Sequence, residues 1–116
     1  HNGLGIYHQA IKDLNKALEL DPKNIHAYAN RGWSYTGLGD DKQAIIDFNK
    51  AIELDPGYAD GYYNLAVFYA VKGDKQKTLN YLSEAIKLNT YLKQKANADV
   101  NFKSLNNDKD FKRLVD

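Results

Sequence analysis

Residues Gly3–Pro22 read GLGIYHQAIKDLNKALELDP, and Gly37–Pro56 read GLGDDKQAIIDFNKAIELDP, with 14 of the 20 positions identical. The two copies lie 34 residues apart, and a looser third copy, KGDKQKTLNYLSEAIKLNT, follows at Lys72–Thr90. A fixed period of about 20–50 residues is the signature of stacked, similar units. The sequence therefore predicts a repeat array in place of one globular core.

Each copy carries apolar residues three and four positions apart, which is the period of an amphipathic α-helix. In the first copy these are Ala10, Ile11, Leu14, Ala17 and Leu18. Asp21-Pro22 and Asp55-Pro56 are expected to end helices, because the residue before proline avoids the α region. Gly39-Asp40 predicts a helix end followed by an N-cap. We expect helices near residues 6–20, 24–37, 41–54, 58–72 and 75–88.

The pattern resembles the tetratricopeptide repeat, a 34-residue helix-turn-helix unit with ordered aromatic, small and proline positions. In the second repeat these positions hold Tyr28, Gly32, Tyr35, Ala44, Phe48, Ala51 and Pro56. In the third they hold Tyr62, Ala66, Tyr69, Thr78, Leu82, Ala85 and Thr90. Small residues are also needed on physical grounds, because helices that cross about 8–10 Å apart exclude large side chains. The resemblance implies an all-α fold, a right-handed superhelical solenoid of helix pairs.

Four segments are expected along the chain. Residues 1–22 form the second helix of a truncated first repeat, 23–56 and 57–90 form complete repeats, and 91–116 form a C-terminal segment. That last segment has its own rhythm, at Asp99, Phe102, Leu105, Asp108, Phe111 and Leu114. It resembles the segment after the last repeat in some bacterial tetratricopeptide proteins, so we expect short helices that cap the array. Docking of this segment on a partner is the alternative.

Composition excludes several classes of protein. The formal charge of +1 lacks the basic surplus of a nucleic-acid-binding protein. Cysteine is absent, which excludes disulfides and thiolate chemistry, and no apolar run approaches the roughly 18–20 residues of a membrane span. The sequence begins with His1 and contains no Met, so we expect a piece of a longer protein. The compartment stays unknown, with the cytoplasm favoured.

The resemblance places binding on the concave surface formed by the first helix of each repeat. The candidate partner-binding residues there are His26, Asn30, Trp33, Asp60, Tyr63, Asn64 and Val67. Asn30 and Asn64 occupy equivalent positions, and an amide can hydrogen-bond a peptide backbone without reading its sequence. We expect Trp33 and Tyr63 to be exposed anchors, since Trp and Tyr are common hot-spot residues. The alternatives are tolerated polar residues for the asparagines and inter-helix packing for Trp33.

One ligand class fits poorly. Carboxylate-clamp repeats, which hold the acidic C-termini of cytosolic chaperones, need cations where the resemblance places Asp60 and Asn64. Arg31 stands where the family usually has Leu, and two interpretations remain open for it. It could reach a ligand carboxylate, or it could extend along the helix to the surface.

No catalytic constellation is expected. His1, His8 and His26 lack the spacing of a metal site, and Asp108 and Asp110 lack the remaining ligands of a calcium loop. The GLG motifs lack the Lys-Ser/Thr pair of a phosphate-binding loop. We therefore expect no cofactor, no metal and no enzymatic activity in this segment.

Three hypotheses on function remain. The leading one is a non-catalytic protein–protein interaction module that holds a peptide or helix in its concave groove. The second is a self-assembling scaffold, in which Ile11, Leu14 and Leu18 of the unpaired first helix contact another copy. The third is an accessory domain of a larger enzyme. RNA binding by helical repeats ranks below all three, because it favours a 35-residue period and a basic face.

Overall fold

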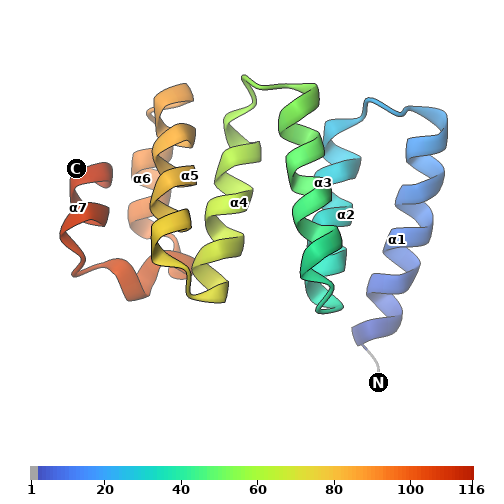
Figure 1. The fold of residues 1–116 in the computed structure, drawn as a ribbon, viewed down its shortest axis with the longest axis horizontal. Coiled ribbons are helices and arrows are strands. Elements are labelled where there is room, and N and C mark those ends of the chain that lie inside the picture. The colour runs from blue at the N-terminus through green and yellow to red at the C-terminus, as the bar shows by residue number, and fades with distance from the viewer. Residues whose placement is uncertain (1–2) are drawn as a thin grey trace. The chain divides into compact units, whose positions relative to one another are not determined.

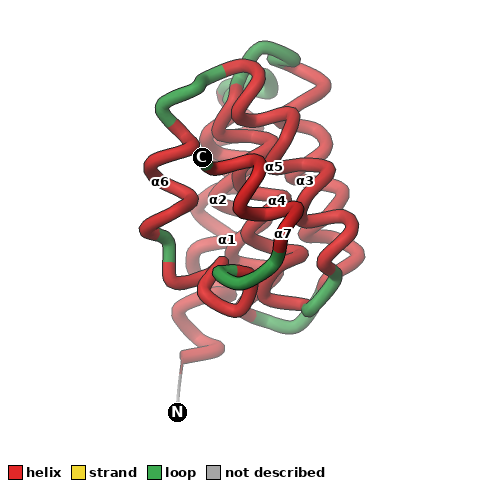
Figure 2. The backbone as a smooth tube through the Cα atoms, turned by 90° about the vertical axis from the view of Figure 1, so that its left-hand side faces the viewer, coloured by secondary structure: helices red, strands yellow, loops and turns green. Residues whose placement is uncertain are grey.

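A computed structural model describes residues 3–116, and over this range the chain forms helices and loops without a strand (Figure 1, Figure 2). The helices are α1 (Gly3–Leu20), α2 (Ile25–Gly37), α3 (Asp41–Leu54), α4 (Ala59–Lys72), α5 (Lys75–Leu88), α6 (Leu92–Ala98), the 3₁₀ helix η1 (Val100–Leu105) and α7 (Lys109–Val115). They form two compact units, unit 1 (His1–Pro56) and unit 2 (Gly57–Asp116). The all-α class predicted from the sequence is confirmed.

Local capping sets the helix boundaries. The carboxylates of Asp40 and Asp74 each accept a hydrogen bond from the N–H three residues ahead, at 3.3 Å and 3.1 Å. Gly39 and Gly73, just before them, have φ of 80° and 84°, a left-handed conformation that glycine adopts without steric cost. These residues set the ends of α2 and α4 and the starts of α3 and α5, and α2 to α5 all begin and end within one residue of the predicted positions.

The first helix differs from the prediction because it starts three residues earlier, at Gly3. The second copy of the motif turns at Gly39, and the next residue, Asp40, caps a new helix. In the first copy the residue after Gly5 is Ile6, whose side chain cannot accept a capping hydrogen bond. The helix therefore runs through Gly5 without a turn.

Close contact between α2 and α3 organises unit 1, where the two helices run antiparallel (Figure 1). A Cβ atom added to Gly32 would lie 2.8 Å from Cε1 of Phe48, so a side chain at this position would push the helices apart. Ala44 and Ala51 of α3 are fully buried as well. These three small residues are packing residues, as the sequence predicted.

The first helix was expected to be unpaired, with Ile11, Leu14 and Leu18 free to contact another copy, and this is wrong in part because α1 packs against α2. Leu18 is buried, while Ile11 and Leu14 are half-buried. The large apolar side chains that α1 exposes are instead near its ends, at Leu4, Ile6, Tyr7 and Leu20.

Unit 2 contains a second antiparallel hairpin, α4–α5, and three short helical elements that follow it (Figure 1). The C-terminal segment packs on the hairpin, with η1 against α4 and α7 against α5. Phe102 of η1 and Phe111 of α7 are fully buried and join the core around Leu82 and Ala85. The two phenylalanines are therefore interior residues of unit 2. That the segment serves as a cap stays a prediction.

Candidate partner-binding site

Three of the seven candidate residues lie on one face of α2 in unit 1. His26 and Asn30 are exposed, and Trp33, one turn further along, is half-buried. The side-chain amide of Asn30 makes no hydrogen bond to any residue that the structure describes, and the residue is exposed. This face can therefore offer hydrogen bonds to a ligand backbone.

Trp33 is both a packing residue and a surface residue. Its ring meets the buried ring of Phe48 edge-on, with centroids 4.8 Å apart and an interplanar angle of 67°. This contact fixes the indole, which keeps part of its surface accessible. A rigid, half-exposed tryptophan loses little conformational entropy when a ligand packs on it.

Tyr7 of α1 borders the same face and was missed by the sequence analysis. A Cβ atom at Gly37, the last residue of α2, would overlap the Tyr7 ring. The tyrosine thus lies directly on the glycine and stays partly exposed. The available signal was Gly37 itself, since a glycine on a helix face permits another side chain to approach the backbone.

The other four candidates lie on α4 in unit 2, where they divide into two groups. Asp60 is exposed, and Asn64 and Val67 are half-buried, so all three keep accessible surface. The Asn64 amide, like that of Asn30, makes no hydrogen bond within residues 3–116. Tyr63 belongs to the second group.

The expectation of an exposed anchor at Tyr63 is wrong, because Tyr63 is only 4% exposed. Its hydroxyl donates a 2.6 Å hydrogen bond to the Asp99 carboxylate, and its ring meets Phe102 edge-on at 5.7 Å. The ammonium group of Lys95 lies 4.7 Å from the ring centroid. Burial and the Asp99 hydrogen bond both raise the pKa of the Tyr63 hydroxyl well above its usual value. The C-terminal segment thus covers this part of α4.

Three family models match the chain: two described as Tetratricopeptide repeat match residues 26–58 and 48–80, and one described as TPR repeat matches residues 3–39. The chain belongs to the tetratricopeptide repeat family. No curated protein matches it. Tetratricopeptide repeats generally mediate protein–protein interaction and are typically non-catalytic.

Arg31, at a position where tetratricopeptide repeats usually have Leu, follows neither predicted interpretation. Its guanidinium donates two 2.8 Å hydrogen bonds to the buried carboxylate of Asp47 and a third, also 2.8 Å, to Asn15 of α1. It also lies over the ring of Tyr28. The hydrogen bond to Asp47 raises the Arg31 pKa. Arg31 therefore links all three helices of unit 1.

A signal for this ion pair was present in the tetratricopeptide pattern. Asp47 stands at helical spacing among the buried residues Ala44, Phe48 and Ala51, where an unpaired carboxylate would be costly. A carboxylate on a buried helix face needs a cationic partner. Arg31 is the candidate on the neighbouring helix, because it stands where the family usually has Leu.

Neither a metal-binding cluster nor a membrane-spanning helix occurs within residues 3–116. Across residues 3–116, His, Cys, Asp and Glu side chains do not gather in threes as a metal site requires. Over the same residues the helices lack the combination of length and apolar character that crossing a bilayer demands. Of the histidines considered from the sequence, His1 lies outside the described residues.

Proposed function

We propose that this chain is a non-catalytic interaction module that binds a peptide or helix of a partner protein on the groove-side faces of α2 and α4. The observation that carries the proposal is the pair of amides, Asn30 and Asn64, which occupy equivalent positions in two repeats. Both amides lack a hydrogen-bond partner among the described residues. A partner backbone supplies the missing donors and acceptors.

Four other residues complete the proposed site. Trp33 provides an apolar anchor held by Phe48, and Val67 provides a smaller apolar contact on α4. His26 and Asp60, which are exposed at the starts of the two helices, contribute polar contacts at the rim. Tyr63 is buried, so the proposed site does not include it.

The test is a selection of binding peptides from a random library on the wild-type chain, followed by affinity measurements on variants. Replacing both asparagines, Asn30→Ala with Asn64→Ala, is expected to weaken the selected peptides roughly tenfold, since two hydrogen bonds are lost. The helical content should not change, because neither amide bonds to the fold. Asn49→Ala is the matched control, an exposed asparagine on α3. Equal affinity for the double variant and the control would refute the site.

We also propose a division of the chain into repeats, in which 1–22 is the second half of a truncated first repeat, 23–56 and 57–90 are complete repeats, and 91–116 is a C-terminal cap. Support comes from the turns at Gly39 and Gly73 and from the burial of Phe102 and Phe111 against the α4–α5 hairpin.

Self-association through α1 is a second candidate function, favoured by one observation. Leu4 and Ile6 are 57% and 72% exposed at the start of this helix. Exposed apolar side chains of this kind often mark contacts between proteins. Sedimentation over a range of concentrations tests the candidate, with Ile6→Ser expected to abolish any increase in mass. A chain that stays monomeric throughout removes the idea.

A further inference from the structure

The C-terminal segment binds the α4–α5 hairpin through two copies of one pattern, Asp-x-x-Phe-x-x-Leu. In both copies the aspartate carboxylate accepts a hydrogen bond from an N–H of its own helical turn, in η1 for Asp99 and in α7 for Asp108. In both, the phenylalanine three residues on is fully buried. The two turns therefore use the same residues for the same tasks.

The hairpin supplies a matching donor to each aspartate. The Tyr63 hydroxyl of α4 donates to Asp99 at 2.6 Å, and the Lys75 ammonium of α5 pairs with Asp108 at 2.5 Å. Each carboxylate thus joins a helical turn to the hairpin, while the adjacent phenylalanine fills its core. This side of the hairpin recognises an acid and an aromatic ring three residues apart.

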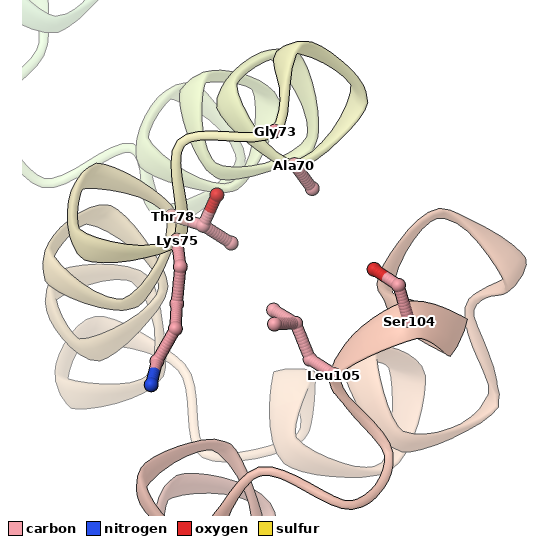
Figure 3. Close-up of a pocket in the computed structure, with 6 residues that line it drawn as sticks. All are labelled: Ala70, Gly73, Lys75, Thr78, Ser104 and Leu105. Atoms are coloured by element: carbon pink, nitrogen blue, oxygen red, sulfur yellow. The ribbon is translucent and has the colours of Figure 1, made fainter.

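The seam between the segment and the hairpin is incompletely filled. A cavity of about 60 Å³ lies between Ala70, Gly73, Lys75 and Thr78 on the hairpin side and Ser104 and Leu105 on the other (Figure 3). An open groove of about 300 Å³ lies on the surface beside the contact of α5 with α7, lined by Gln76, Leu79, Asp110, Arg113 and Leu114. Well-packed protein interiors contain few voids like the cavity beside Thr78 and Leu105. The elements that dock here are also short, at six or seven residues each, and such helices are marginal without tertiary contacts.

We propose that this side of the α4–α5 hairpin is a second binding surface, which takes acidic-x-x-Phe helical turns of another protein in exchange for the chain's own residues 99–115. The chain's own C-terminal segment competes with the partner for this surface, and its covalent tether keeps its effective concentration near the millimolar range. A partner binds the hairpin when its segment packs on it better than the chain's own segment does, or when the contacts of the chain's own segment are weakened. The surface is distinct from the Asn30 and Asn64 amides.

The probe is a fluorescent synthetic peptide of residues 97–116, and its binding to the full chain is followed by anisotropy. Phe102→Ala in the chain weakens the tethered competitor without removing Tyr63 or Lys75. The peptide is therefore expected to bind this variant at least about tenfold more tightly than the wild type. Asp108→Asn, a change at a half-buried carboxylate outside the apolar core, is expected to give a smaller gain in the same direction.

The matched control peptide has identical composition, with Asp99 exchanged with Asn101 and Asp108 exchanged with Asn107. It is expected to bind the Phe102→Ala chain about tenfold more weakly, because neither carboxylate meets its donor. Equal binding of the two peptides, or no binding to either chain variant, overturns the proposal. Asn30→Ala should leave peptide binding unchanged, so failure here and failure of the groove site are separate results.

Native-state hydrogen exchange on the wild type supplies an independent readout. If the C-terminal segment opens locally, the amide hydrogens of residues 99–115 are expected to exchange faster than those of α4 and α5. Loss of protection only through global unfolding would contradict an exchangeable segment. If the mass of the wild type doubles as its concentration rises, and the mass of the Phe102→Ala variant rises less, the surface binds a second copy of this chain. That result would overturn the proposal of a foreign partner.

Discussion

Helices α2 in unit 1 and α4 in unit 2 share a sequence pattern and present different surfaces. On α2, Asn30 and Trp33 keep accessible surface, and Tyr7 packs on Gly37 of the same helix. On α4 the C-terminal segment covers Tyr63, while Asn64 remains partly accessible. The repeat period fixes which residues share a face, and the elements that pack next to each helix decide which of them are accessible.

Among the substitutions that test this comparison, Phe102→Ala is expected to change stability the most. The residue is fully buried between Tyr63 and Phe111, so its loss should cost about 3–5 kcal/mol of unfolding free energy. Hydrogen exchange should rise in unit 2 and stay nearly constant in α2 and α3, because repeats are stabilised mainly by their neighbours. Equal loss of protection in both units would show that the coverage of α4 is not local.

Arg31→Ala tests the corresponding feature of unit 1. It leaves the buried Asp47 carboxylate without its cation and should cost about 3 kcal/mol. Replacing both partners by leucine, Arg31→Leu with Asp47→Leu, should recover most of that loss, because an apolar pair leaves no unpaired charge. Urea denaturation of the three proteins measures both effects. A single variant that costs less than about 1 kcal/mol would mean that Asp47 finds another partner.

A smaller effect is expected from Tyr63→Phe, which keeps the ring on Phe102 and removes only the hydroxyl. Loss of a hydrogen bond to a carboxylate should cost about 1.5 kcal/mol, measured by urea denaturation. Tyr69→Phe on the same helix is the matched control, because the Tyr69 ring stacks on Tyr81 and its hydroxyl makes no hydrogen bond within residues 3–116. Similar losses in the two variants would rule out a special role for the Asp99 contact.

The smallest effect concerns pH. The hydrogen bond from Lys75 lowers the pKa of Asp108 below its usual value. A carboxyl group whose pKa falls on folding stabilises the fold above its unfolded pKa of about 3.9, and this contribution disappears as the pH falls through the lower folded value. Thermal melts of wild type and Asp108→Asn should therefore differ at neutral pH and converge below about pH 3. A difference that persists in acid would assign the effect to something other than this charge.

Sequence periodicity and capping residues were sufficient to predict the spans of α2 to α5, since both act over a few neighbouring residues. The features that the sequence did not predict depend on contacts between residues far apart in the chain. Tyr63 is covered by Asp99 and Phe102, more than 35 residues later, and a helical period does not tell what packs on a face. Arg31 and Asp47 pair across a hairpin, where only the two departures from an apolar pattern gave a hint. The early start of α1 came from one missing cap, at Ile6.

The contact between Trp33 and Phe48 also has a spectroscopic consequence. Trp33 is the single tryptophan of the sequence, and its indole packs on a core ring of unit 1. Fluorescence excited at the red edge of the tryptophan absorption band, where tyrosine does not absorb, therefore reports on unit 1 alone. Far-ultraviolet circular dichroism averages over all helices. The unmodified chain thus carries its own reporter for whether the two units unfold together or one after the other.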